Sequence, residues 1–300
     1  MPVMSTAIGA GDHMSERRAS IVWALLAAAL YAISSPVSKA LLDDVPPTMM
    51  AALLYLGAGL GMLLLGLVRR WAGLGESERR LTRSDLPYTV GMIALDIAAP
   101  ICLMAGLAST TSANASLLNN FEIVVTSLIA LLVFGEAISR RLWLAIGLIT
   151  LSSLILSFED ASSLSFSSGS LLVLAACVCW GFENNCTRMM SQSDPLEIVV
   201  LKGFGSGLGS LAIAFAAGES IPAPPYVLGA LLLGFLAYGL SIFFYVYAQR
   251  QRGAAKTSAY YAIAPFIGAG LSLVLFRTWP EPAFWVALAI MAAGAYLAAE

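Results

Sequence analysis

The stretch IVWALLAAALYAISSPVSKALLDDVPP at residues 21–47 is echoed about half a chain later by SLLVLAACVCWGFENNCTRMMSQSDPL at residues 170–196. The equivalent pairs in this alignment include Tyr31 and Trp180, Lys39 and Arg188, and Pro46 and Pro195. A second alignment of the chain with itself, at a slightly different offset, pairs Ser116 with Ser258, Phe134 with Phe276, and Trp143 with Trp285. The chain therefore consists of two related halves, and because each half is very apolar, the repeat is typical of membrane proteins.

The composition agrees with a membrane protein. Hydrophobic residues make up 59% of the chain, charged residues make up 11%, and the mean hydropathy is +0.84. A soluble domain has about 25% charged residues, so most of this surface must face lipid. The formal net charge of −2 gives no basic field that would attract nucleic acid.

The sequence offers no set of metal ligands, and we expect no cofactor. The one histidine, His13, lies in the N-terminal tail, and the four cysteines all fall within apolar segments. Cys177 and Cys179 are spaced like a ligand pair, but partner ligands are missing. This pattern favours buried, unreactive thiols.

Ten apolar segments are long enough to cross a bilayer, which takes about 20 residues. The first half supplies 20–42, 47–69, 85–107, 111–134 and 140–158, and the second supplies 168–190, 196–217, 225–249, 255–276 and 281–299. The runs are too long for barrel strands and do not alternate. The sequence therefore predicts an all-α polytopic membrane protein with two five-helix repeats, 20–158 and 168–299, after a disordered cytoplasmic tail, 1–19.

Lys and Arg residues predict the orientation, because they concentrate in cytoplasmic loops. With a cytoplasmic N-terminus, 13 of the 16 Lys and Arg residues lie on the cytoplasmic side. These are Arg17, Arg18, Arg69, Arg70, Arg79, Arg80, Arg83, Arg140, Arg141, Arg188, Arg250, Arg252 and Lys256. We therefore expect both termini in the cytoplasm. Since five helices are an odd number, the second half enters from the opposite side, and such an inverted repeat suits alternating access.

Two motifs resemble a known family. The run from Trp180 to Arg188, WGFENNCTR, is similar to the first-helix signature of EamA-type proteins in the drug/metabolite transporter superfamily, and Phe134-Gly135-Glu136 is similar to the end of that family's fourth helix. The other copies differ, with Tyr31-Ala32 and Arg277-Thr278 at the equivalent places. The resemblance implies a solute exporter or exchanger with a central cavity lined by both halves. The aromatic content is similar to that of the amino-acid exporter branch.

Four ionisable residues fall inside predicted helices, where a charge costs about 2.5–3.5 kcal/mol on insertion scales. They are Asp96, Glu122, Glu183 and Lys202. One interpretation is a polar binding site, with carboxylates meeting a substrate ammonium and Lys202 meeting a carboxylate. In a second, Glu122 or Glu183 carries a proton, because burial favours a neutral carboxyl group. In a third, the roles are structural: Glu183 pairs with Lys202, or Lys202 extends to the inner face.

Amides and aromatic rings complete the candidate site. The amides are Asn119, Asn120 and Asn184, and the rings are Tyr31, Trp180, Tyr238, Tyr260 and Tyr261. Amides offer donors and acceptors for a zwitterion, and rings can stack on an aromatic or cationic solute. The alternatives are hydrogen bonds between helices and ordinary packing.

Glycine pairs mark close helix contacts. Gly57 and Gly61 lie in the second predicted helix, and Gly203, Gly205, Gly207 and Gly209 lie in the equivalent seventh helix. Their small-xxx-small spacing predicts close packing between helices, and it is also compatible with sliding or bending.

The leading hypothesis is a multi-pass secondary transporter in the plasma membrane, which would be a bacterial inner membrane. It would export small metabolites, with amino acids, aromatic or other neutral, as the first candidates, driven by the solute gradient or coupled to protons. Its expected partners are the lipid bilayer and a small-molecule solute; we expect no nucleic acid and no ATPase subunit, since no phosphate-binding G-x-x-x-x-G-K-[ST] motif occurs. The alternatives are an exporter of drugs or other organic solutes and an intramembrane lipid-modifying enzyme. No acid/base pair or nucleophile motif supports an enzyme.

Overall fold

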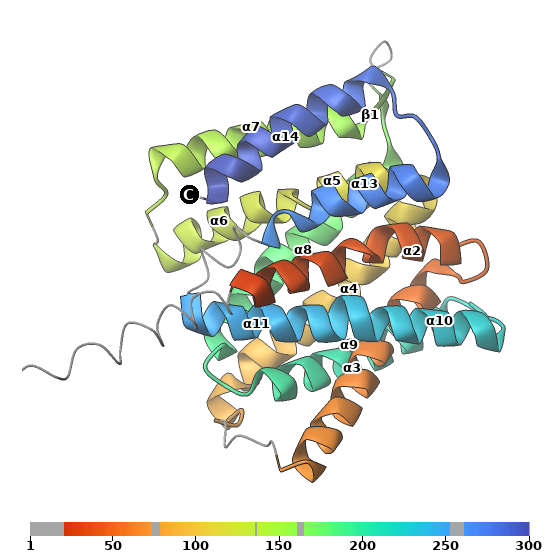
Figure 1. The fold of residues 1–300 in the computed structure, drawn as a ribbon, viewed down its shortest axis with the longest axis vertical. Coiled ribbons are helices and arrows are strands. Elements are labelled where there is room, and N and C mark those ends of the chain that lie inside the picture. The colour runs from red at the N-terminus through yellow and green to blue at the C-terminus, as the bar shows by residue number, and fades with distance from the viewer. Residues whose placement is uncertain (1–20, 74–78, 136, 161–164, 253–260, 300) are drawn as a thin grey trace, which may run out of the picture.

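The computed structural model describes residues 21–73, 79–135, 137–160, 165–252 and 261–299 (Figure 1). The predicted tail at residues 1–19 and the candidate site residue Tyr260 lie outside these ranges. The described part is helical apart from turns and one short pair of strands.

The first half contains five helical segments. Residues Ile21–Leu41 form the first, and its last part is α2 (Ser34–Leu41). The others are α3 (Pro47–Trp71), α4 (Leu86–Ser109) after a 3-10 turn η1 (Arg83–Asp85), α5 (Ser112–Leu118) with α6 (Phe121–Phe134), and α7 (Arg140–Ser157). The predicted helix 111–134 is therefore interrupted at Asn119 and Asn120, which is a correction to the sequence-based boundaries.

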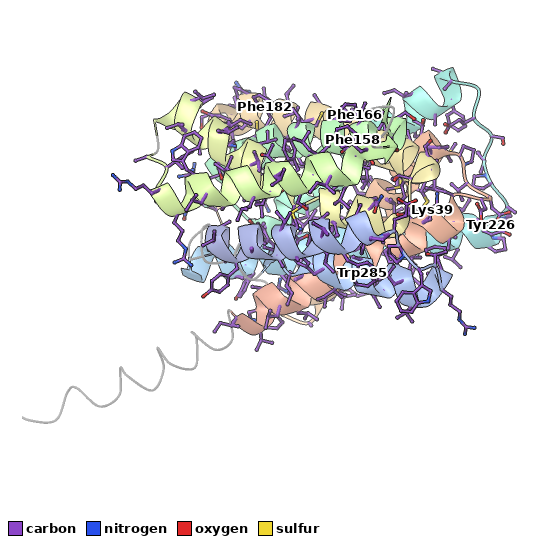
Figure 2. All side chains as sticks on the ribbon, turned by 90° about the horizontal axis from the view of Figure 1, so that it is seen from above. Lys39, Phe158, Phe166, Phe182, Tyr226 and Trp285 are labelled. Atoms are coloured by element: carbon purple, nitrogen blue, oxygen red, sulfur yellow. The ribbon has the colours of Figure 1, made fainter. Side chains whose placement is uncertain are left out.

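The second half begins after a short link. Strands β1 (Phe158–Asp160) and β2 (Ser165–Phe166) pair antiparallel, and the rings of Phe158 and Phe166 stack with centroids 4.6 Å apart (Figure 2). The helices are α8 (Ser168–Met190), α9 (Pro195–Ala216), α10 (Pro224–Gly234), a π-helical segment η2 (Phe235–Leu240), α11 (Ser241–Arg252), α13 (Ala264–Phe276) and α14 (Pro282–Ala299).

Helix ends follow local sequence. Side-chain oxygens of Thr111, Ser139, Ser167 and Asp194 accept hydrogen bonds from backbone N–H groups in the first turns of α5, α7, α8 and α9, which caps otherwise unpaired donors. Proline occupies the first turn of α3, α4, α9 and α10, where its missing N–H costs nothing. The polar loop residues therefore set where each apolar run begins.

Eight of the described helical spans are long and apolar enough to cross a membrane. All five spans of the first half qualify; in the second half α9, the segment Pro224–Ala248 and α14 qualify. The remaining two predicted segments, 168–190 and 255–276, contain α8 and the shorter apolar helix α13. Multi-pass membrane insertion follows from these helices, and the number ten stays a prediction.

The helices pack as the repeat requires. Three contacts join equivalent helices of the two halves: α3 with α9, α5 with α13, and α7 with α14; the last pair lies together at the top of Figure 1. Other contacts form matched pairs, since α4 packs on α9 as α10 packs on α3. The two halves are therefore interleaved rather than side by side.

Glycines let these helices approach closely. A Cβ atom on Gly203 would overlap the backbone of Gly59, at the crossing of α3 and α9. Gly57 and Gly61 face Leu231 and Phe235, whereas Gly205 and Gly209 face Ile93 and Ile97 of α4. The close packing predicted from the glycine spacing is confirmed. The pair in α3 lies at the contact with α10 and η2, and the pair Gly205 and Gly209 lies at the contact of α9 with α4.

The two ends of the bundle differ in charge. At one end, Leu81 N donates to the Glu197 carboxylate and the Arg69 guanidinium lies 5.8 Å from the Phe243 ring centroid. This end carries the loop and helix-end arginines of the described residues 69–73, 79–83, 140–141 and 188, and we call it the basic end. At the opposite end, the Lys39 ammonium donates to Leu107 O and Ala108 O at 2.6 and 3.1 Å, where α4 exposes unpaired carbonyl groups.

Candidate functional site

A cavity of about 370 Å³ lies inside the bundle. Residues from α6, α8, η2, α11 and the segment before α13 line it, so both halves contribute. Pockets of roughly 300–1,000 Å³ are typical for small ligands. The volume suits a solute of metabolite size.

Aromatic rings form one wall. Six aromatic side chains of the described residues line the cavity: Tyr31, Tyr55, Trp180, Tyr238, Tyr245 and Tyr261. The Tyr238 ring centroid lies 5.9 Å from that of Tyr31 and 5.3 Å from that of Tyr55, and the Tyr31 and Tyr261 centroids lie 5.6 Å apart. Such spacing is favourable for ring pairs, so the wall is a continuous aromatic surface.

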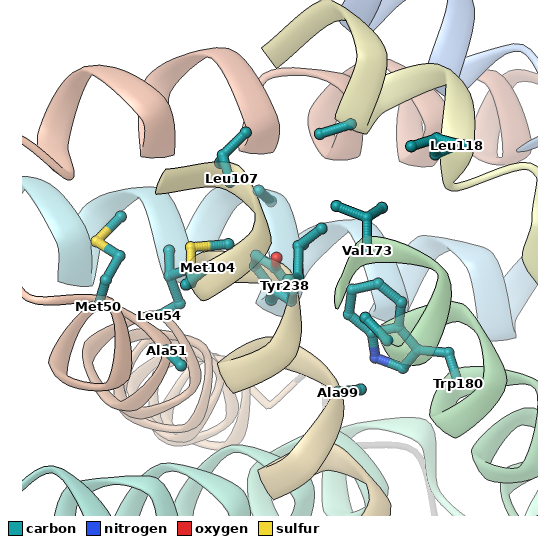
Figure 3. Packing of buried hydrophobic residues seen from close by; sticks show 14 of the residues in the cluster. Met50, Ala51, Leu54, Ala99, Met104, Leu107, Leu118, Val173, Trp180 and Tyr238 are labelled. Atoms are coloured by element: carbon teal, nitrogen blue, oxygen red, sulfur yellow. The ribbon is translucent and has the colours of Figure 1, made fainter. Parts of the chain in front are cut away.

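Tyr238 sits at the centre of this wall because of its helix. It belongs to the π-helical segment η2, is 2% exposed, and lies among buried residues that include Trp180 (Figure 3). Its hydroxyl accepts a hydrogen bond of 3.0 Å from Ser34 Oγ of α2. A π-helical turn changes the helix register and is frequent at functional sites.

Charged groups form a second wall. The Lys202 ammonium lies 2.9 Å from Glu183 Oε1 and 3.1 Å from Asp96 Oδ2. Tyr55 OH donates to Asp96 Oδ1 at 2.9 Å. These residues come from α9, α8, α4 and α3, so one ionic cluster ties four helices together.

Glu122 lies next to this cluster and has a different hydrogen-bond partner. Its carboxylate accepts a short hydrogen bond from the Asn184 amide of α8, and Glu183 accepts one from the Thr187 hydroxyl. Asp96 and Glu183 are 0% and 2% exposed, whereas Glu122 is half-buried. Glu122 is therefore the carboxylate of this group that has accessible surface on the cavity.

The interruption between α5 and α6 also reaches the cavity. Asn119 and Asn120 occupy it, and both line the cavity. Leu118 O, which loses its regular helical partner, lies 3.5 Å from the Cys177 sulfur. The Oδ1 atoms of both asparagines are buried with no hydrogen-bond partner among the described residues. Polar groups of this kind make a broken helix a potential ligand contact.

The cavity opens toward the basic end. Its wall continues past Thr126 and Ser127 to Ala137, Ile138, Leu142 and Ala298, where α6 and α14 end and α7 begins. At the opposite end, Ser112 and Ser272 share a hydrogen bond of 2.7 Å between α5 and α13. The lining of the cavity therefore reaches the basic end, and α5 contacts α13 at the opposite end.

The structure brings most of the predicted site residues together. Those that line the cavity are Tyr31, Asn119, Asn120, Glu122, Trp180, Glu183, Asn184, Lys202, Tyr238 and Tyr261. Asp96 lies behind the wall and contacts the site through Lys202, and Tyr260 lies outside the described residues. Binding of a solute by any of these residues stays a prediction.

Sequence reasoning missed other lining residues. They include Tyr55, Thr126, Thr187, Arg188 and Tyr245. Tyr55 had a usable signal, because it lies in the middle of α3, away from the interfacial positions where tyrosine is common. Thr126 and Thr187 carry no such signal, since threonine is unremarkable in membrane helices.

The acidic side chains of the cavity region pair with neighbouring donors. Asp96 and Glu183 contact Lys202 and the hydroxyls of Tyr55 and Thr187, and Glu122 contacts the Asn184 amide. In the ranges that the structure describes, no group of three or more His, Cys, Asp or Glu side chains could hold a metal ion.

Comparison with known proteins gives the family. The model of the EamA-like transporter family matches twice, at residues 18–158 and 167–299. The chain belongs to the EamA-like transporter family. The repeat in the sequence is therefore a repeat of the family's unit, and the protein is a multi-pass membrane transporter of the drug/metabolite transporter superfamily, which acts on a small solute in a lipid bilayer.

One relative and one solved structure are similar to this chain. The chain is 26% identical over 275 residues to an uncharacterized transporter of Methanothermobacter thermautotrophicus, covering 84% of this chain and 78% of the relative. A crystal structure of a protein without further description has a TM-score of 0.69 and 19% identity, and the match covers 93% of this EamA protein and 95% of the other chain. At that identity, the second match supports the fold alone.

Proposed function

We propose that this EamA protein is a secondary transporter that exports small metabolites by alternating access. The observation that carries the proposal is the cavity of about 370 Å³, which both halves line and whose lining reaches the basic end. A channel would need a path open to both sides. A closed contact between Ser112 and Ser272 instead fits one of two alternating states.

The repeat supports two such states. With five spans in each half, the second copy runs through the membrane in the opposite sense, so the contacts that close one end have counterparts at the other. The basic end would be cytoplasmic by the positive-inside rule, which places both termini inside and this structure in an inward-open state. The membrane would be the plasma membrane, here a bacterial inner membrane.

Amino acids, aromatic or other neutral, are the leading solutes. The tyrosine wall suits an aromatic or aliphatic side chain, and Glu122 suits an ammonium group. The same wall would also accept other organic solutes, so export of drug-like molecules is the second candidate.

The energy would come from the solute's own gradient or from protons. Glu122 is the proton-carrier candidate, because its half-buried carboxylate accepts a hydrogen bond from the neutral Asn184 amide, whereas Asp96 and Glu183 are paired with Lys202. A carboxylate in such a place is neutralised more readily than one paired with a cation.

Counterflow in proteoliposomes tests the proposal. The full chain is reconstituted, the vesicles are loaded with unlabelled phenylalanine, and uptake of labelled phenylalanine, leucine and glutamate is followed against empty liposomes. We expect phenylalanine and leucine to accumulate transiently above the level in empty liposomes, and glutamate to stay at it. If no amino acid or drug-like solute shows counterflow, the proposal is wrong.

A further inference from the structure

We infer that this cavity recognises its solute through an ammonium group and does not require a carboxylate, so that aromatic amines without a carboxylate bind as well as aromatic amino acids. The inference rests on the proposed function and specifies the solute class. It follows from the distribution of charge on the cavity walls.

Lys202 has little capacity for a solute carboxylate. Its ammonium already faces two carboxylates, Glu183 at 2.9 Å and Asp96 at 3.1 Å, and the side chain is 7% exposed. A solute carboxylate would be a third anion around one buried cation. Such a contact would displace one of two ion pairs in a medium where an unpaired buried charge is costly.

Glu122 is complementary to an ammonium. It is half-buried, lines the cavity, and accepts a hydrogen bond from the Asn184 amide. A carboxylate offers about four acceptor positions, so positions remain for the N–H groups of an ammonium. The position is therefore an anionic site that faces open space.

The tyrosines nearby strengthen this preference. Tyr31 and Tyr261 line the same cavity as Glu122, and their ring centroids lie 5.6 Å apart. The negative face of an aromatic ring attracts a cation, most of all away from water. Rings and a carboxylate together favour a cationic head group next to an apolar body.

Among the described residues that line the cavity, Arg188 is the second cation besides Lys202. It is exposed in the last turn of α8, one turn beyond Asn184 and toward the basic end, and it has an interaction of its own. A carboxylate bound there would lie at the mouth of the cavity. The experiment therefore includes this residue as the competing explanation.

Three probes with the same ring isolate the two charged groups. Phenylalanine carries both groups, phenethylamine lacks the carboxylate, and 3-phenylpropionate lacks the ammonium. Isothermal titration of the full chain in detergent at neutral pH measures each Kd and avoids the passive membrane crossing of the amine. We expect phenethylamine to bind within fivefold of phenylalanine and 3-phenylpropionate to bind at least tenfold more weakly.

The variant Glu122→Gln should weaken the binding of phenylalanine and of phenethylamine at least tenfold. Glu281→Gln is the matched control, because Glu281 is exposed beside α14 at the opposite end; its Kd values should stay within twofold of the wild type. The wild-type comparison of the three probes holds even if Glu122→Gln fails to fold.

Several results would overturn the inference. Binding of phenylalanine without binding of phenethylamine would show that the carboxylate is required, and the proposed function would stand. If Arg188→Gln weakens the binding of phenylalanine tenfold but leaves the binding of phenethylamine unchanged, the carboxylate is bound at Arg188 and the inference is wrong. Failure of all three probes to bind also contradicts it, whereas the proposed function is decided separately by counterflow.

Discussion

The ammonium of Lys202 lies 2.9 Å from the carboxylate of Glu183, and the two residues belong to consecutive helices, α9 and α8, beside the cavity. Asp96 completes this cluster from α4 at 3.1 Å. One positive charge thus compensates two buried carboxylates, and this cluster holds the cavity wall in place.

Lys202→Met should destabilise the fold severely, by about 3–5 kcal/mol, because it leaves two buried carboxylates without their cation. Thermal unfolding in detergent, followed by the loss of the helical signal, measures the effect. The triple variant Lys202→Met, Asp96→Asn, Glu183→Gln removes the charges together and should recover most of the stability. A single variant that melts like the wild type would contradict this account.

Gly203→Ala should lower the free energy of unfolding by about 1–3 kcal/mol, since the new Cβ would overlap Gly59 across the α3–α9 contact. Gly147→Ala is the control, because Gly147 is exposed in α7 and a Cβ there meets no atom within 4 Å. Alanine at that position should stabilise the helix by about 0.5–1 kcal/mol. Equal melting temperatures for both variants would mean that the close approach does not matter.

Arg277→Gly should stabilise the protein by about 1 kcal/mol. Arg277 has φ 51° and Gly135, its repeat equivalent, has φ 66°, so both helix ends adopt the left-handed conformation that favours glycine. The reverse change, Gly135→Arg, should cost a similar amount. Thermal unfolding of both variants checks this prediction. If Arg277→Gly lowers the stability, the contacts of the arginine side chain stabilise the protein by more than the left-handed backbone conformation destabilises it.

The apolar pattern was sufficient to predict the helices and the two repeats, because hydrocarbon demands long apolar runs with internally paired backbones. It did not reveal the interruption at Asn119 and Asn120 or the π-helical segment at Tyr238. Both lie inside apolar runs, where the sequence pattern is the same for a regular and an irregular helix.

The candidate site could be predicted only in part. Asp96 and Lys202 stood out because charges are rare inside membranes. Whether each side chain faces the cavity or a neighbouring helix depends on how α4 and α9 are rotated about their axes. Because both helices are apolar on every face, the sequence does not specify this rotation. Tyr55 was missed for the same reason, since its neighbours in α3 are uniformly apolar.

Accessibility should differ between the two ends of the cavity. In a variant without the native cysteines, Ile138→Cys at the mouth should react with a water-soluble maleimide at least tenfold faster than Ser272→Cys, which replaces a side chain buried against Ser112 at 2% exposure. Reaction rates in detergent measure this difference. Similar rates at both positions would mean that the opposite end is not closed.

Counterflow tests the central claim most directly, because it requires one cavity that alternates between two sides of a membrane. Proteoliposomes loaded with unlabelled phenylalanine should accumulate labelled phenylalanine transiently, and Glu122→Gln should reduce that peak at least tenfold while Glu281→Gln leaves it unchanged. Steady leakage of the label in the wild type, without any transient peak, would contradict alternating access.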